Sequence, residues 1–167
     1  MSRTSLKGYA RGVRILLSAA RFVGGAYAVW AGTLIARPGA TGDDVAWAQP
    51  EFDDSAWKPI EIGKPWEKAG HEGYDGYGWY RLRVDMPKAA SESAYFEHFQ
   101  RLTLLLGAVD DVDVTYFNGV EVGRTGSAPD DTKGHYKTIR RYEVPAKHIR
   151  WDAENVIAVR VFDSDGD

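Results

Sequence analysis

The chain has 167 residues, a formal net charge of -3, 44% hydrophobic residues and 27% charged residues. This length and balance are those of one soluble globular domain with its own core, and the small negative charge gives no reason to expect nucleic acid as a partner. There is no cysteine, which excludes a disulfide framework and a zinc site built from thiolates.

The first 42 residues differ from the remainder in charge. They hold six of the 21 basic residues and none of the 24 acidic residues, so the remainder has nine more acids than bases. A basic start is followed by the apolar residues 15–20, by Arg21 and by the uncharged stretch 22–36. The apolar run is shorter than the ~20 residues of a usual membrane span.

Two interpretations of this segment stay open. A secretory signal has a basic segment, an apolar segment and a small-x-small cleavage site, for which Ala26-Tyr27-Ala28 qualifies. The alternative is a leader that belongs to no domain. We expect residues 1–42 to be a leader outside the fold; a signal would make the protein secreted or periplasmic, and a membrane becomes a partner only if the segment stays as an uncleaved anchor.

Beyond residue 42 the hydrophobic pattern has a period of two, which predicts strands. Residues 79–86 place Tyr80, Leu82, Val84 and Met86 on one face and more polar side chains on the other, which predicts a half-buried antiparallel strand that ends at Pro87. Residues 92–101 are either a short helical turn or a loop. The nearly continuous apolar run 101–106 predicts a central strand.

The next two alternating runs, 112–117 and 120–123, are separated by Asn118-Gly119, a strong hairpin signal because both residues tolerate a positive φ. Further strands are predicted over 136–144, ended by Pro145, and over 156–162, where apolar residues on both faces indicate burial. Several short strands without a long helical pattern predict an all-β fold, an antiparallel β-sandwich.

An ordered set of motifs carries a family resemblance. The set consists of Asp43-Asp44 with Trp47, Pro50-x-Phe52-Asp53-Asp54-Ser55-x-Trp57, Trp66-Glu67, Tyr74-Asp75-Gly76, Trp79-Tyr80-Arg81, Leu106-Gly107, Asp110-Asp111, Phe117-Asn118-Gly119, Val122-Gly123 and Asn155 to Val161. These motifs resemble the amino-terminal, galactose-binding-like jelly roll of family 2 glycoside hydrolases (the β-galactosidase and β-glucuronidase-like enzymes). They resemble the same module of sialate O-acetylesterase-like proteins at least as closely.

The resemblance implies a jelly-roll domain over residues 43–167 that belongs to a larger carbohydrate-active hydrolase, a glycosidase or a sugar O-acetylesterase. In both families the catalytic groups lie in a separate domain. Most of the motifs also have a purely architectural explanation. Asp53 and Asp54 can cap a turn, Trp57 can plug the end of the sandwich, and Arg81 can pair with one of the acids.

No catalytic set is predicted within this chain. A glycosidase needs two carboxylates that flank the scissile bond, and 24 acidic residues make such pairs easy to imagine without evidence for any of them. Gly126-Ser127 lacks the surroundings of a nucleophile elbow, and the four histidines lack metalloenzyme spacing. We assign no metal site and no cofactor, with structural calcium as the alternative, on Asp110-Asp111-x-Asp113 or on residues 163–167.

The best candidates for sugar contact lie in a glycine-rich stretch that is rich in aromatic and acidic residues. They are Trp66, Glu67, Tyr74, Asp75, Tyr77 and Trp79. Aromatic faces stack on pyranose rings and carboxylates accept from hydroxyls, so we expect sugar contact from this loop and not from the sheet faces. The alternative is that these rings seal the edge of the sandwich.

The resulting functional hypothesis is a non-catalytic module that supports a sugar-processing catalytic domain and contributes contacts to carbohydrate. An autonomous carbohydrate-binding module is the second hypothesis, and an intact small hydrolase is the third. The expected partners are therefore carbohydrate and the catalytic domain of the parent protein.

Overall fold

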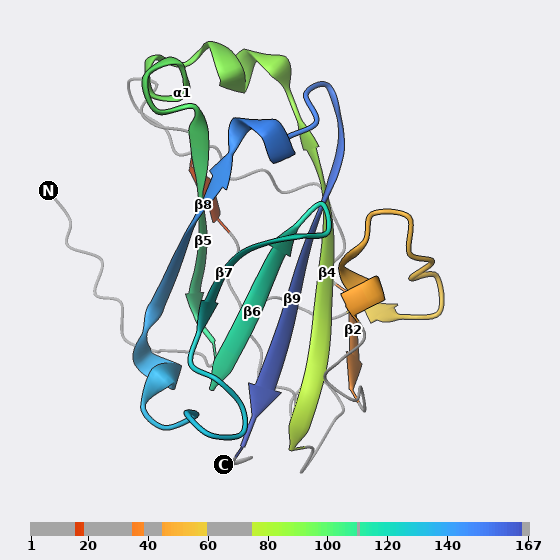
Figure 1. Ribbon diagram of the computed structural model, residues 1–167. Helices are drawn as coiled ribbons and strands as arrows, with labels where there is room; N and C mark the ends of the chain where they lie inside the picture. The colour runs from red at the N-terminus through yellow and green to blue at the C-terminus, as the bar shows by residue number, and fades with distance from the viewer. Residues whose placement is uncertain (1–15, 19–34, 39–44, 60–74, 110, 165–167) are drawn as a thin grey trace, which may run out of the picture.

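The computed structural model describes residues 16–18, 35–38, 45–59, 75–109 and 111–164. Within these ranges the strands form two antiparallel sheets that face one another (Figure 1). The six-stranded sheet has the order β3 (Lys58–Pro59), β2 (Ile35–Pro38), β4 (Gly76–Met86), β9 (Ala153–Asp163), β6 (Val112–Phe117) and β7 (Val120–Thr125). The three-stranded sheet has the order β1 (Leu16–Ser18), β5 (Arg101–Ala108) and β8 (Ile139–Pro145). The all-β sandwich is confirmed, while its jelly-roll connectivity stays a prediction.

The helical segments of the described chain are short. The α-helix is α1 (Ala94–Phe99), and the 3₁₀ turns are η1 (Val45–Ala48), η3 (Lys88–Glu92), η4 (His135–Lys137) and η5 (Ala146–His148). The open alternative over 92–101 thus resolves as a helical turn. Ser93 caps it, because its hydroxyl accepts from the Phe96 N–H at 3.2 Å. None of the helices in the described ranges has the length and apolar character needed to cross a membrane.

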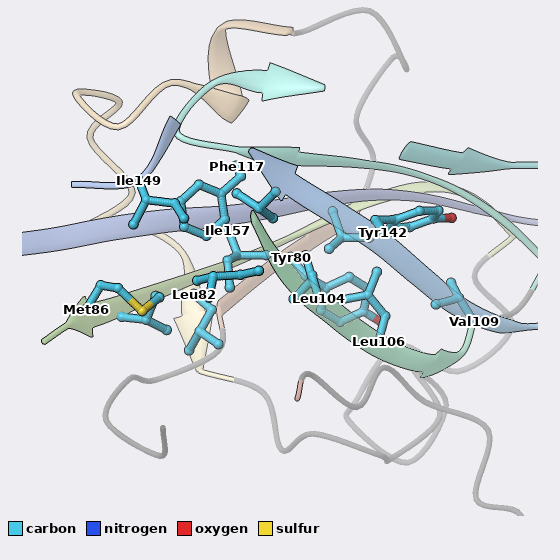
Figure 2. Close-up of a cluster of buried hydrophobic side chains, with 14 of the residues drawn as sticks. Tyr80, Leu82, Met86, Leu104, Leu106, Val109, Phe117, Tyr142, Ile149 and Ile157 are labelled. Carbon is cyan, nitrogen blue, oxygen red and sulfur yellow. The ribbon is translucent and has the colours of Figure 1, made fainter. Parts of the chain in front are cut away.

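The main core lies between the two sheets (Figure 2). Its buried members are Tyr80, Leu82, Val84, Met86, Phe96, Leu102, Leu104, Leu106, Val109, Phe117, Tyr142, Val144, Ile149, Ile157, Val159 and Val161. Alternation in β5 turns Leu102, Leu104 and Leu106 inward, where each is at most 1% exposed. Burying a side chain of this size stabilises the fold by about 1.5–3 kcal/mol, so these side chains hold the sheets together.

Strand β4 is covered on both faces around Trp79 and Arg81, which corrects the half-buried strand predicted there, whereas Asp85 further along the same face is exposed as predicted. Trp79 and Arg81 are only 0% and 1% exposed. Residues 45–57 fold over them and form a second cluster, which contains Ala48, Trp57, Trp79, Val114, Tyr116 and Ala158 with Trp47, Phe52 and Tyr77 packed against it. The ring of Trp47 lies 5.3 Å from that of Trp57 and 6.1 Å from that of Trp79. The alternating pattern of β4 did not reveal this burial, because the residues that cover its outer face, 45–57, are distant in the sequence.

An ion pair ties this cover to the sheet. Arg81 Nε donates to Asp54 Oδ2 at 2.8 Å, and its other nitrogens donate to the carbonyls of Trp47 and Gln49. Arg83 Nη2 reaches both oxygens of Asp54 at 3.2 Å. Burial acts to raise the pKa of Asp54, but the hydrogen bonds from Arg81 and Arg83 outweigh it and hold that pKa below its usual value. The predicted pairing of Arg81 with an acid is therefore confirmed.

The hairpin between β6 and β7 turns at Asn118-Gly119, as predicted. Both residues have positive φ, 48° and 80°. Asn118 also fastens the turn to the start of β9: its Nδ2 donates to Asn155 Oδ1 at 2.8 Å, and its Oδ1 accepts from the Val156 N–H at 2.8 Å. The side chain therefore serves the packing between strands as well as the turn.

Two short strands lie within residues 1–42. β1 pairs with β5, and β2 lies between β3 and β4 in the six-stranded sheet. The sequence pattern predicted neither pairing. The division into a leader over 1–42 and a domain over 43–167 stays a prediction.

We expect Gly119→Val to lower the free energy of unfolding by about 1 kcal/mol or more, because a β-branched residue resists the φ of +80° at this position. Urea denaturation measures the effect. The matched control is Val120→Thr, which keeps the shape of a neighbouring exposed side chain. Equal losses in the two variants would show that backbone strain is not the cause.

We expect Asp54→Asn to destabilise the protein by about 2 kcal/mol at neutral pH, because hydrogen bonds to two guanidinium groups are lost. The pKa of Asp54 is lowered in the fold, so its contribution is present above its unfolded pKa of about 3.9 and is lost as the pH falls through the folded value. Denaturation at pH 7 and at pH 2.5 should show a deficit that shrinks in acid. Asp130→Asn, at an exposed loop position, is the control.

Candidate functional site

The predicted sugar-contact residues are only partly within the described structure. Trp66, Glu67 and Tyr74 lie outside the described residues. Asp75 is exposed, and Tyr77 is half-buried on β4. Trp79 is fully buried in the second cluster, so a sugar contact by this ring would require the cluster to open. The assignment as a group stays a prediction, and Tyr77 is its member that borders a pocket.

That pocket has a volume of about 40 Å³ and lies on the outer face of the six-stranded sheet, which is turned away from the main core. Its lining consists of Tyr77, Val112, Asp113, Val114, Arg124, Gly126, Ser127, Ala128, Arg160 and Phe162. Four strands and the segment after β7 therefore contribute to one small site.

Strand register brings the two arginines of the pocket together. Arg160 of β9 lies opposite Val114 of β6, and Val114 lies opposite Arg124 of β7. Neighbouring strands are about 4.8 Å apart, so the two arginine backbones are about 10 Å apart across one short side chain. Arg124 donates through Nε and Nη2 to the two oxygens of Glu121 at 2.8 and 2.7 Å. Those hydrogen bonds lower the pKa of Glu121 against the effect of burial.

A second row of side chains completes the pocket. Phe162 of β9 lies opposite Tyr77 on one side and Val112 on the other. The rings of Tyr77 and Phe162 are 4.8 Å apart, and the Arg160 guanidinium lies 5.5 Å from the Tyr77 ring centroid. Gly126 forms the opposite wall with its backbone, since a Cβ there would lie 2.2 Å from a methyl group of Val112.

Arg140 of β8 holds the loop that continues from this wall. The loop over 126–138 lies at the end of the sandwich opposite α1 (Figure 1). Arg140 Nη1 donates to the carbonyls of His135 and Thr138 at 2.6 Å, and Nη2 donates to that of Asp111 at 2.7 Å. Its Nε donates to Asp113 Oδ1 at 2.8 Å. One buried side chain thus fixes three backbone carbonyls that lie outside the strands.

Asp113 balances this buried charge. Its side chain and that of Arg140 are both 0% exposed. Asp113 Oδ2 accepts from the Thr115 hydroxyl at 2.8 Å, and both oxygens lie 3.0 Å from the Tyr142 hydroxyl. The Tyr142 oxygen in turn lies 2.7 Å from the Thr125 hydroxyl. Burial raises the pKa of Asp113 despite these hydrogen bonds, and burial followed by the Asp113 charge raises the pKa of Tyr142.

The acidic clusters considered for calcium are engaged with protein groups where they are described. Asp113 serves Arg140, and an Asp111 carboxylate oxygen accepts from the Ser164 N–H and hydroxyl. Asp110 and residues 165–167 lie outside the described residues. No group of three or more His, Asp or Glu in the described ranges is arranged to hold a metal ion. Structural calcium at these clusters stays a prediction.

Neither the pocket cations, Arg124 and Arg160, nor the buried pair of Arg140 and Asp113 was predicted from the sequence. The signal for Arg140 was present in the sequence, because it shares the alternating face of Tyr142 and Val144, which point into the core. Arg124 and Arg160 had no comparable signal, since they are far apart in the chain and only the register of β6, β7 and β9 places them together.

Comparisons with known proteins place the fold among the β-sandwiches of glycoside hydrolases. No protein-family model matches the chain, and no curated protein matches it. Among solved structures, the likeness to Bacteroides uniformis β-glucuronidase has a TM-score of 0.59 and 22% identity. It covers 91% of this chain and 15% of that chain.

Two further solved structures show a similar likeness to this chain. A β-glucuronidase from glycoside hydrolase family 2 has a TM-score of 0.57 and 15% identity over 98% of this chain and 15% of its own. A calcium-binding mutant of Bacteroides uniformis β-glucuronidase 2 has a TM-score of 0.60 and 20% identity over 91% of this chain and 15% of its own. The chain thus spans about 15% of the length of these enzymes and shares the fold of that part. These structural matches give no support to the sialate O-acetylesterase-like alternative.

We expect Arg140→Leu to destabilise the protein by about 3–5 kcal/mol at neutral pH, because it leaves the Asp113 carboxylate buried and uncompensated. The deficit should shrink as the pH falls. Asp113 then takes up a proton, and an acid whose pKa is raised in the fold favours the folded state at low pH.

The matched control is Arg141→Leu, the next residue on the same strand, which is exposed and should change stability by less than about 0.5 kcal/mol. Urea denaturation at pH 5 and pH 8 compares the two variants. Similar losses at both positions would contradict the role assigned to the buried pair.

Proposed function

We propose that this chain is a non-catalytic β-sandwich module of a larger carbohydrate-active hydrolase of the family 2 glycosidase type. The observation that carries the proposal is the structural likeness, which covers 91% of this chain and only 15% of a β-glucuronidase. The motifs around Phe52-Asp53-Asp54 and Trp79-Tyr80-Arg81 support it, since they resemble the amino-terminal sandwich of such enzymes. The partners in this proposal are the catalytic domain of the parent protein and its carbohydrate.

Three described carboxylates are bound by arginines, which supports a non-catalytic role for these three. Glycoside hydrolysis needs one carboxyl group that donates a proton and a second that acts as nucleophile or base. Here Asp54 serves two arginines, Asp113 serves Arg140, and Glu121 serves Arg124. Groups engaged in this way position backbone and side chains, and they are poorly placed to exchange protons with a substrate.

A structural calcium would be the one ion to add to this proposal, because one relative is a calcium-binding mutant. The described carboxylates of residues 111 and 113 have protein partners, so such an ion would use other oxygen ligands. Nothing in the proposed role depends on it.

The second candidate is an autonomous carbohydrate-binding module, which the pocket beside Tyr77 favours. An aromatic ring with neighbouring charged donors is a common way to hold a saccharide. A glycan array with the purified 167-residue chain separates the two candidates, since an autonomous module binds glycans without the parent enzyme.

We expect the purified chain to hydrolyse neither chromogenic glycosides nor acetyl esters, and the full parent protein to hydrolyse glycosides. The two preparations are compared in the same assay with equal molar amounts. Turnover by the chain that survives purification, and that one carboxylate or serine substitution removes, would overturn the non-catalytic role. A parent protein without glycosidase activity would overturn the assignment to this class of enzyme.

A further inference from the structure

The turn between β6 and β7 contains a chemically reactive pair of residues. An asparagine side chain loses ammonia when the backbone nitrogen of the next residue attacks its amide carbon, and a following glycine presents that nitrogen without a Cβ in the way. The chain has two asparagines, Asn118 before Gly119 and Asn155 before Val156. The branched side chain of Val156 hinders the same attack at Asn155. The sequence therefore favours deamidation at Asn118.

The fold holds both polar atoms of the Asn118 side chain. Its Nδ2 donates to the His148 carbonyl and to Asn155 Oδ1, both at 2.8 Å. Its Oδ1 accepts from the Val156 N–H at 2.8 Å. Attack on the amide carbon makes that carbon tetrahedral and expels Nδ2, so it breaks the two bonds from Nδ2 and displaces Oδ1 from its donor. The folded hairpin therefore opposes the reaction that its sequence favours.

The product of the reaction does not fit this site. A carboxylate at position 118 has no N–H to donate, so it would face two acceptors, the His148 carbonyl and Asn155 Oδ1. The Asn155 amide is itself fixed in its orientation. Its Oδ1 accepts from the Arg150 N–H at 2.8 Å, and its Nδ2 donates to the carbonyls of Arg150 and Ala153 at 2.8 and 2.9 Å. Turning this amide to meet the carboxylate would break all three of those bonds.

We propose that Asn118 is a deamidation site that the folded hairpin protects and that reacts when the hairpin comes away from β9. In the reaction the Gly119 nitrogen forms a bond to Asn118 Cγ and gives up its proton, the Cγ–Nδ2 bond breaks, and ammonia leaves with that proton. Water then opens the resulting five-membered ring and yields aspartate or isoaspartate. Neither product restores the bonds from Nδ2, so the reaction makes an otherwise reversible opening irreversible.

The test compares the rate of deamidation in the folded and in the unfolded 167-residue chain. Samples are held at mildly alkaline pH in buffer and in denaturing urea, digested in acid, and analysed by mass spectrometry of the peptides that contain the two asparagines. We expect Asn118 to convert in urea at least about tenfold faster than Asn155, because a branched residue follows Asn155. In buffer Asn118 should convert at least about a hundredfold more slowly than in urea, since the reaction then waits for opening.

Two variants test the chemistry without depending on the fold, because they are compared in urea. Gly119→Val should slow the conversion of Asn118 at least about tenfold, since its branched side chain hinders the attacking nitrogen. Val120→Thr changes the residue beyond that nitrogen and should leave the rate unchanged.

A third variant, Asn118→Asp, carries the product side chain from the start. It should raise the unfolded fraction about tenfold or more in urea denaturation, because two hydrogen bonds are lost and their acceptors face a carboxylate. The matched control is Asp130→Asn, the reverse exchange at an exposed loop position, which should leave the unfolded fraction nearly unchanged.

Four results would each overturn the inference: no conversion of Asn118 in urea, equal rates for Asn118 and Asn155 in urea, equal rates for Asn118 in buffer and in urea, or an Asn118→Asp variant as stable as the unmodified chain. The proposed function is independent of all four, because it fails only if the parent protein lacks glycosidase activity.

Discussion

The pairing of β4 with β9 is the constraint on which the rest of the structure depends. The two strands pair from Gly76 to Met86, eleven residues, in the middle of the larger sheet. An antiparallel sheet commonly leaves one face to solvent, but here apolar side chains occupy both faces of this pair. The three-stranded sheet covers the inner face. Residues 45–57 cover part of the outer face, and the pocket lies beyond that cover, where Tyr77 and Arg160 are half-exposed.

Two buried ion pairs attach irregular segments to this frame. On the outer face Arg81 binds Asp54 and the carbonyls of Trp47 and Gln49. On the inner face Arg140 does the same for the chain around residues 111 and 135–138. A buried ion pair often adds little stability compared with an apolar replacement. These two arginines have a further role. Backbone carbonyls outside the strands lack hydrogen-bond partners on a neighbouring strand, and one guanidinium donates to several of them at once.

The parts of the fold that the sequence predicts are those whose signals are local. The hairpin follows from two alternating runs and the tolerance of Asn118-Gly119 for positive φ, and β5 follows from one apolar run. The burial of Trp79 and Arg81 does not, because the cover over them comes from about thirty residues upstream. Arg140 was missed for another reason: although it alternates with buried Tyr142 and Val144, a charged residue is usually assigned to the outer face unless its partner, Asp113, is known. The pocket could not be predicted from the sequence, because only the register of β6, β7 and β9 brings its residues together.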